Sequence, residues 1–262
     1  MSVAGAPVGR EEILAALGAA LGPLPGALAL WEGGSVAFGR ADALSDLDLY
    51  VLAEDQAVEE ILAAVEAALE GLSPFAARLR LPEPTWHGHA QAFYLLRDAP
   101  EHLVVDLVVL RRSLPDRFLE RERHGVPIVH FDRTGEVAPA PLDREAFAEA
   151  AARRLAALRS EFALFQGFVR VEVARGNALA ALAAYRGYTL RPLLEVVRLR
   201  HCPERYDYGL KYSQADLPEE VVRRLEHLAY FAGIEGIPDR QRQAEAWFAE
   251  TVAALERDGL GL

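Results

Sequence analysis

Two aspartates, Asp46 and Asp48, are two residues apart in the segment Ser-Asp-Leu-Asp-Leu-Tyr-Val, and a glycine pair precedes them along the chain. In an extended segment side chains alternate between faces, so both carboxylates point the same way. Carboxylates placed like this repel each other unless a cation lies between them, and Mg²⁺ bound by carboxylates and substrate phosphates is the usual solution. Upstream, Gly34 lets backbone N–H groups come close to a ligand and Ser35 adds a hydroxyl. The pattern predicts a site for a metal and a phosphorylated ligand.

A third carboxylate, Asp106, interrupts the aliphatic run Leu-Val-Val-Asp-Leu-Val-Val-Leu, which is typical of a buried strand. An unpaired carboxylate in such a strand is strongly unfavourable, and a bound metal removes that cost. If Asp46 and Asp48 lie on a neighbouring strand, the three acids can hold two ions about 3.5 to 4 Å apart, the arrangement that assists displacement at phosphorus. In that arrangement Asp106 lies nearest the attacking hydroxyl and can accept its proton.

Each of these features has a simpler interpretation when taken alone. The glycine pair is then a tight turn, the aspartate pair a polar strand edge, and Asp106 a buried acid paired with one of the arginines. Their order and spacing within one stretch of chain favour a single site.

The same residues resemble a known family. Gly34-Ser35, Gly39 and Ser45-Asp46-Leu47-Asp48-Leu49 resemble the GS…G…SDxDL signature of the polymerase β-like nucleotidyltransferase superfamily, with Asp106 in place of its third acid. Within it the layout is similar to the antibiotic nucleotidyltransferases, especially the streptomycin-type and other aminoglycoside adenylyltransferases, in which a helical domain follows the catalytic domain. The close match covers about residues 27–110.

The resemblance implies Mg²⁺-dependent transfer of a nucleotidyl group, AMP where ATP is the donor, from a nucleoside triphosphate to a hydroxyl of a small molecule such as an aminoglycoside-like antibiotic. It assigns metal binding and catalysis to Asp46, Asp48 and Asp106. The residues expected to bind the triphosphate from the same domain are Gly34, Ser35 and Ser45.

Lys211 is the single lysine among 28 basic residues, the others being arginine. A compact ammonium suits a triphosphate better than the wide guanidinium fork does, so a lysine kept in such a chain suggests a phosphate contact. Its segment, Tyr-Gly-Leu-Lys-Tyr, also resembles the lysine-containing segment in the helical domain of streptomycin-type adenylyltransferases. The alternative is a surface lysine without a role in nucleotide binding.

Composition narrows the class of protein. A net charge of −11 argues against a nucleic-acid substrate, because phosphate backbones are bound by clustered basic residues. No apolar run approaches the length of a membrane span and no signal peptide is recognisable, so we expect a cytoplasmic protein that does not bind membranes. The single cysteine excludes an internal disulfide and fits that compartment.

The predicted fold is an α/β (α+β) domain with a mixed sheet over residues 1–136, a Pro-containing linker over 137–141, and an all-α helical bundle over 142–262. Strands are expected near 27–31, 46–53, 77–81, 90–97, 102–111 and 127–132. Helices are expected near 10–21, 55–71, 115–123, 143–175, 177–201, 217–233 and 239–258, with a short helix or turn within 36–44 and a kink or break at Pro192.

Two other functions stay open at this stage. One is a protein AMP-transferase of a toxin–antitoxin type regulatory pair, against which the large helical domain counts. The other is a non-catalytic nucleotide-binding module, against which the intact Asp46, Asp48 and Asp106 count. The pair His87 and His89 has the alternation of a strand face, but two histidines without further ligands favour solvent-facing side chains over a metal site.

Overall fold

The computed structural model describes residues 8–259, and the chain divides into two compact units, Met1–Leu142 and Asp143–Leu262. The first unit contains a mixed sheet with helices, and the described part of the second contains helices and no strand. The expected fold class, an α+β domain followed by an all-α region, is therefore confirmed. The division falls at the end of the segment 137–141 that the sequence identifies as a linker.

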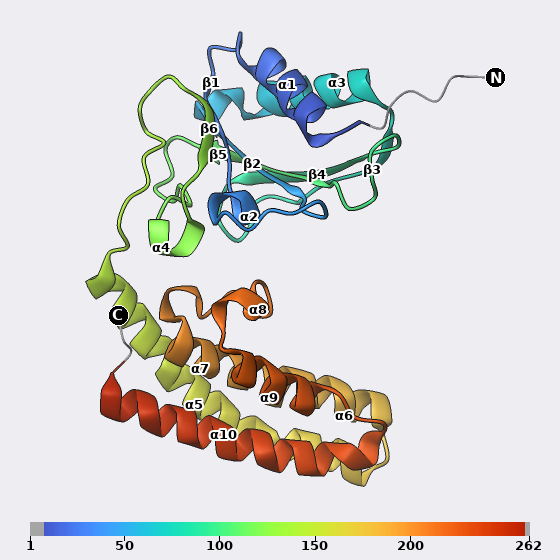
Figure 1. The fold of residues 1–262 in the computed structure, drawn as a ribbon, viewed down its shortest axis with the longest axis vertical. Coiled ribbons are helices and arrows are strands. Elements are labelled where there is room, and N and C mark those ends of the chain that lie inside the picture. The colour runs from blue at the N-terminus through green and yellow to red at the C-terminus, as the bar shows by residue number, and fades with distance from the viewer. Residues whose placement is uncertain (1–7, 260–262) are drawn as a thin grey trace, which may run out of the picture. The chain divides into compact units, whose positions relative to one another are not determined.

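Six strands form one sheet in the order β3-β4-β5-β2-β1-β6 (Figure 1). β2 and β5 run parallel, and the other neighbouring pairs are antiparallel. The strand bounds are β1 (Ala27–Glu32), β2 (Leu47–Ala53), β3 (Phe75–Arg80), β4 (Ala90–Leu96), β5 (Val105–Arg111) and β6 (Ile128–Asp132).

One face of the sheet carries the main core of the first unit. Helices α1 (Arg10–Leu21) and α3 (Val58–Leu72) both lie over this face (Figure 1). Apolar residues recur along both helices at helical spacing, and they pack on alternate residues of β2, β4 and β5 such as Leu47, Leu49 and Leu107. Because alternate side chains of a strand point to opposite faces, the polar residues between these leucines lie on the other face of the sheet.

That second face is only partly apolar. A smaller core that includes Trp31, Leu52 and Leu110 covers one part of it. The helices α2 (Gly34–Ala37) and α4 (Arg121–His124) are single turns, and the short helix η1 (Asp55–Ala57) leads into α3. The polar part of this face holds the candidate site.

The two edges of the sheet differ in chemistry. On β3, Arg78 and Arg80 form ion pairs with Glu66 and Glu59 of α3. Arginines along an exposed edge discourage pairing with other chains. The opposite edge, β6, instead carries the exposed apolar side chains of Ile128 and Val129, 46% and 43% exposed.

The second unit is built from helices packed around a main core, with a smaller cluster of Val169, Ala181, Tyr185 and Ile237 beside it. Leu158 and Phe162 of the longest helix pack against Trp247 and Phe248 of the last one, and the rings of Phe162 and Phe248 stack with centroids 3.8 Å apart. The elements are α5 (Arg144–Ala174), α6 (Ala178–Ala184), η2 (Tyr185–Leu190), α7 (Arg191–His201), η3 (Pro203–Arg205), α8 (Ser213–Asp216), α9 (Glu219–Ala229), η4 (Ile234–Gly236) and α10 (Ile237–Asp258).

A π-helical turn, η2, interrupts the helix that the sequence predicts over 177–201. A buried side-chain network holds it: the Gln166 amide donates to the Tyr188 carbonyl at 2.7 Å, and the Thr189 hydroxyl donates to Gln166 Oε1 at 2.7 Å. Pro192 lies in the first turn of α7, where a helix tolerates the missing N–H. The interruption of the helix is therefore the π turn at Tyr185–Leu190, a few residues before the predicted position at Pro192.

The helix expected over 115–123 is wrong in its bounds, because only Arg121–His124 forms a helical turn. The Arg117 guanidinium donates instead to the backbone carbonyls of Arg111, Arg112 and Leu114, which holds the preceding segment as a compact loop. Among residues 8–259, no helix has the combination of length and apolar character needed to cross a bilayer.

A fully buried arginine organises the loops after α7. The Arg198 guanidinium donates to the carbonyl of Arg205 at 2.7 Å, to those of Gly209 and Lys211 at 3.3 Å each, and to the Asp216 carboxylate at 2.8 Å. The side chains of Arg198 and Asp216 are both 0% exposed. Removing one partner of such a pair leaves an uncompensated buried charge.

We predict that Asp216→Ala lowers the free energy of unfolding by about 3 to 5 kcal/mol, because it leaves the Arg198 guanidinium buried without its carboxylate. Urea denaturation followed by circular dichroism measures the change. The matched control, Glu219→Ala, removes the partner of Arg223 from an ion pair whose side chains are 82% and 66% exposed, and should cost less than about 1 kcal/mol. Equal losses would contradict an organising role for Arg198.

Candidate functional site

Two of the predicted carboxylates lie side by side on the polar face of the sheet. β2 and β5 pair in parallel with Asp48 opposite Asp106. Adjacent strands are about 4.8 Å apart, so the two carboxylates are held close together. Both residues are half-buried. The Asp106 carboxylate also accepts a hydrogen bond of 2.7 Å from the Gln91 amide of β4. The long-range pairing predicted from the sequence thus brings these two acids together.

The glycine turn packs directly on Asp48. The Gly33 N–H donates to the Asp48 carbonyl at 2.9 Å, which joins the end of β1 to β2. Gly34 has a φ of +58°, and a Cβ at this position would lie 1.5 Å from Asp48 Oδ2. Only glycine allows both the left-handed backbone and this close approach. The turn and the carboxylate therefore form one compact cradle.

The remaining residues predicted for this site lie around the cradle. Ser35 is in the first turn of α2. The Ser45 hydroxyl accepts the Asp42 N–H at 2.9 Å and donates to Asp42 Oδ1 at 3.1 Å, so it closes the loop before β2. Asp46 immediately precedes β2 with an exposed side chain, and its carbonyl accepts a 2.9 Å hydrogen bond from Arg10.

The donor set suits a hard divalent cation, although the three acids do not form one cluster. Among residues 8–259, no three acidic, histidine or cysteine side chains gather closely enough to hold an ion. Asp48 and Asp106 are paired by register, whereas Asp46 is not grouped with them. Two adjacent carboxylates, with a glycine cradle that a Cβ would fill, fit Mg²⁺ bound jointly by protein and phosphates. Binding of metal by all three aspartates stays a prediction.

Glu32, a buried acid that the sequence interpretation missed, directly precedes the Gly33-Gly34 turn. Glu32, the last residue of β1, is 4% exposed; its carboxylate pairs with Arg10 and accepts from His130 Nε2 at 3.0 Å. Arg10 also donates to the Asp46 carbonyl, so one guanidinium connects the end of β1 to the start of β2. The acid at the end of the apolar run Ala-Leu-Ala-Leu-Trp was the available signal.

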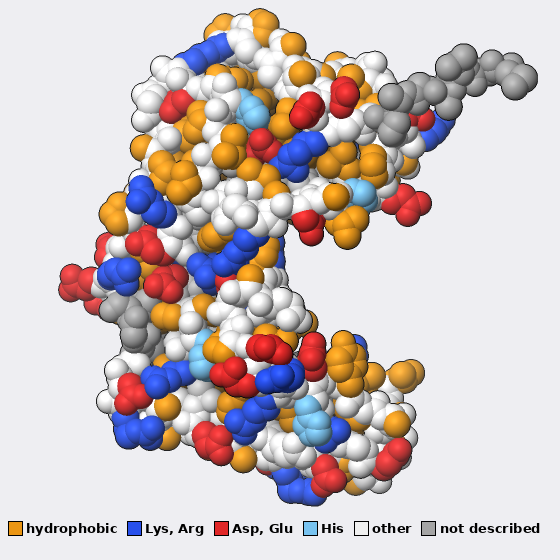
Figure 2. Space-filling view, in the orientation of Figure 1, with side chains coloured by type: hydrophobic (Ala, Val, Ile, Leu, Met, Phe, Trp, Pro, Cys, Tyr) orange, Lys and Arg blue, Asp and Glu red, His pale blue; other side chains and the backbone are white. Residues whose placement is uncertain are grey.

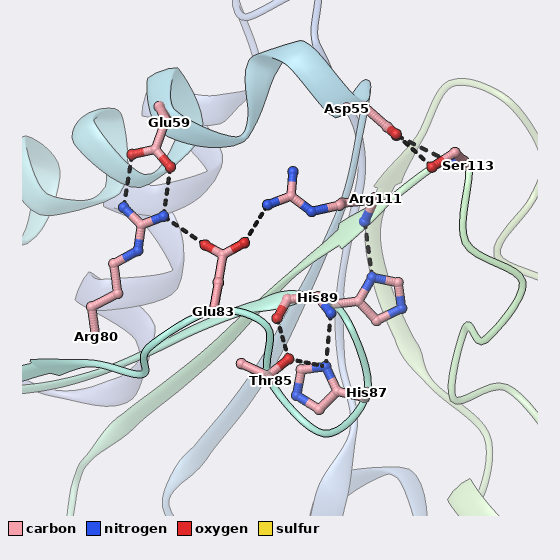
Figure 3. Close-up of polar contacts among 9 residues, drawn as sticks. All are labelled: Asp55, Glu59, Arg80, Glu83, Thr85, His87, His89, Arg111 and Ser113. Carbon is pink, nitrogen blue, oxygen red and sulfur yellow. Dashed lines mark hydrogen bonds and ion pairs between the residues drawn. The ribbon is translucent and has the colours of Figure 1, made fainter.

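The histidines near the site do not face solvent as expected. His89 is fully buried, and burial lowers the pKa of its imidazole. Its Nδ1 accepts the Arg111 N–H at 3.0 Å and its Nε2 donates to the Asp116 carbonyl at 3.0 Å. The half-buried His87 contacts Thr85 and the His89 backbone (Figure 3). The expectation of solvent-facing histidines is wrong, because the His89 ring bonds the backbone of Arg111 and Asp116 and the His87 ring accepts the His89 N–H.

Ion pairs also fix the loop before β4. The Glu83 carboxylate accepts a hydrogen bond from the Arg80 guanidinium at 2.8 Å and also pairs with Arg111 (Figure 3). Arg80 in turn forms an ion pair with Glu59 of α3. Hydrogen bonds from Arg80 lower the pKa of the Glu83 carboxyl. The loop that carries His87 is thus fixed to both α3 and β5.

Lys211 lies in the second unit, in the loop organised by Arg198. Its side chain is exposed, and its Nζ lies 5.3 Å from the centroid of the Tyr212 ring. Tyr212 has a φ of +59°, and the carbonyl of Lys211 accepts from Arg198. The backbone of Lys211 is therefore held by a hydrogen bond from Arg198. A contact between the Lys211 side chain and a triphosphate stays a prediction.

Two cavities of the second unit, of about 300 and 370 Å³, share the lining residues Arg154, Arg191 and Glu195. The Arg154 guanidinium forms a two-point contact with the Glu195 carboxylate, at 2.5 and 2.9 Å. The π turn contributes Tyr188 to one cavity, and Tyr206 lines the other. Together we call these two adjoining cavities the groove of the second unit. Its aromatic rings, carboxylates and guanidinium groups are suited to binding a polar, polyhydroxylated molecule.

Surface charge is mixed over the second unit. Figure 2 shows acidic and basic side chains interspersed on its visible face, without a continuous basic stripe. Exposed ion pairs of this unit include Arg224 with Glu250 and Arg242 with Asp239. The mixture of charges on the visible face differs from the clustered basic residues that bind a nucleic-acid backbone.

No protein-family model matches the chain, and no curated protein matches it. Among solved structures, the chain is similar to an aminoglycoside 6-adenyltransferase from Bacillus subtilis, with 13% sequence identity and a TM-score of 0.41 over 95% of this chain and 91% of that one.

We predict that Gly34→Ala impairs divalent-metal binding, because its Cβ must displace the Asp48 carboxylate. Mn²⁺ titration by electron paramagnetic resonance, with a non-hydrolysable triphosphate present, measures the affinity. Gly135→Ala is the matched control: Gly135 has a φ of +71°, and nothing lies within 4 Å of an added Cβ. Each variant should lose about 1 kcal/mol of stability through its left-handed backbone. The same Mn²⁺ affinity in both variants would mean that Asp48 does not bind the metal.

Proposed function

We propose that this protein is a Mg²⁺-dependent nucleotidyltransferase that moves a nucleotidyl group, AMP when ATP is the donor, to a hydroxyl of a small molecule such as an aminoglycoside-like antibiotic. The observation that carries the proposal is the pairing of Asp48 with Asp106 beside the Gly33-Gly34 turn. A carboxylate pair next to a turn with approachable N–H groups is suited to a metal–triphosphate complex.

Each part of this site has a task in the proposed reaction. Asp46, Asp48 and Asp106 would hold the metal, which neutralises phosphate charge and polarises the reacting oxygens when bound. The Gly34 turn and Ser35 would bind the phosphate oxygens. Asp106 would accept the proton of the acceptor hydroxyl as the bond to the α-phosphorus forms and pyrophosphate leaves. Positioning and charge neutralisation then supply most of the catalysis.

The groove of the second unit is the best-supported binding surface for the acceptor. It combines the rings of Tyr188 and Tyr206 with the carboxylates of Glu161, Glu195 and Asp207. Sugar hydroxyls and amines can donate hydrogen bonds to these carboxylates, and sugar rings can pack on the aromatic faces. This chemistry favours a small polyhydroxylated amine over a polynucleotide.

The decisive experiment is a transfer screen with triphosphates labelled in the α-phosphate, offered with aminoglycosides, lincosamides and cell lysate. A labelled small molecule supports the proposal. A labelled protein in the lysate would instead identify a protein AMP-transferase. Binding of the triphosphate without transfer to any acceptor would identify a nucleotide-binding module.

In the same assay, Asp46→Asn and Asp48→Asn should each lower transfer by at least about a hundredfold, because each removes a charged ligand from the metal. Thermal stability should not fall, since replacing Asp48 relieves its repulsion with Asp106. The control, Asp239→Asn, makes the same chemical change at a side chain that is 68% exposed and should keep full activity. Turnover within tenfold of wild type for either site variant would exclude the two-metal mechanism.

Lys211→Arg tests whether the helical unit takes part in nucleotide binding. We expect a higher KM for the triphosphate or slower turnover with an unchanged melting temperature, because the wider guanidinium cannot take the place of a compact ammonium on the phosphates. The reverse exchange at an exposed helix position, Arg223→Lys, is the control. Wild-type kinetics in Lys211→Arg would mean that Lys211 has no specific role in binding the triphosphate.

A further inference from the structure

A directed chain of hydrogen bonds ends on the Asp106 carboxylate. The His89 N–H donates to His87 Nδ1 at 3.1 Å. His87 Nε2 lies 3.2 Å from Gln91 Oε1, and Gln91 Nε2 donates to Asp106 Oδ1 at 2.7 Å. His87 is in the loop before β4, Gln91 is on β4 and Asp106 is on β5, so the chain crosses three segments of the first unit.

The direction of every bond follows from the first one. A backbone N–H can only donate, so His87 Nδ1 must accept, and the neutral ring then carries its proton on Nε2. That proton is donated to Gln91 Oε1. The amide is thereby fixed with its NH₂ group toward Asp106, because the opposite orientation would set two donors against each other at His87.

The loop holds His87 in this role. The Thr85 hydroxyl donates its one proton to the His89 carbonyl at 2.5 Å and so leaves Nδ1 of His87 to the His89 N–H (Figure 3). The buried His89 fastens the loop to β5 through the Arg111 N–H. Hydrogen bonds therefore hold the His87 imidazole at both ring nitrogens, with the His89 N–H on one side and Gln91 Oε1 on the other.

The choice of an amide as the partner of Asp106 is informative in this chain. Several other carboxylates of the unit are paired with arginine, as Glu59 is with Arg80 and Glu54 is with Arg112. A guanidinium beside Asp106 would neutralise the carboxylate and repel a cation. The Gln91 amide donates a hydrogen bond that orients the carboxylate and brings no charge of its own.

We propose that Gln91, aimed by His87, is a positioning residue that orients the Asp106 carboxylate toward the metal. The inference rests on the proposed function and adds two residues to its machinery, neither of which touches the reacting atoms. Groups that orient a metal-binding side chain in this way affect metal affinity or activity by about 10- to 100-fold when they are removed.

The test measures metal binding as well as activity. Gln91→Leu keeps similar volume but cannot donate, so we expect Mn²⁺ affinity, measured with a non-hydrolysable triphosphate, to fall by about 10- to 100-fold. The melting temperature should stay close to that of wild type. His87→Leu, which removes the aiming group without touching Asp106, should weaken Mn²⁺ binding in the same direction by a smaller factor. Gln56→Leu, at an exposed glutamine of the same unit, is the control and should bind Mn²⁺ as wild type does.

The outcomes separate this inference from the proposed function. If wild-type protein binds Mn²⁺ and transfers nucleotide while Gln91→Leu and His87→Leu match it in Mn²⁺ affinity, the positioning role is overturned and the function stands. If wild-type protein binds no Mn²⁺ in the presence of triphosphate, the function is overturned and the positioning role with it. Nitrogen NMR of His87 tests the chain independently of activity: a proton on Nε2 supports it, and a neutral ring protonated on Nδ1 would overturn it.

Discussion

The sheet of the first unit holds two like charges at the same register of neighbouring strands. Asp48 and Asp106 are brought together by parallel pairing, which no local change can undo without breaking the sheet. The Gly34 turn lies against the Asp48 carboxylate, and the Gln91 amide donates to the Asp106 carboxylate. In the proposed function, these contacts hold the two acids in place for a cation.

The two units treat buried charge in opposite ways. In the helical unit, the buried Asp216 carboxylate pairs with both Arg198 and Arg205, and backbone carbonyls accept further hydrogen bonds from the Arg198 guanidinium. These contacts organise the loops after α7. In the sheet unit, the Asp106 carboxylate accepts a hydrogen bond from the neutral Gln91 amide. In the proposed function this carboxylate binds metal, whereas the contacts of Asp216 have a structural role.

Periodic features of the sequence predicted most of the fold, and contacts between distant residues were harder to predict. The alternation around Asp48 and the aliphatic run around Asp106 placed both strands, because a buried face imposes period two on the chain. The π turn at Tyr185–Leu190 depends on Gln166 and its buried partners, which no local pattern reveals. The chain of hydrogen bonds from His87 to Asp106 and the burial of Glu32 likewise form only when segments far apart in the sequence meet.

The pairing of β1 with β6 also affects how the chain is made. Glu32 and its partner His130 are 98 positions apart, and β1 is buried along its whole length in the finished sheet. At about 5 to 20 residues per second, a ribosome needs about 5 to 20 s to deliver β6 after β1 has emerged. During that interval the nascent sheet has an open apolar edge and an acid without its histidine. The sheet of the first unit can be completed only when its last strand has left the exit tunnel.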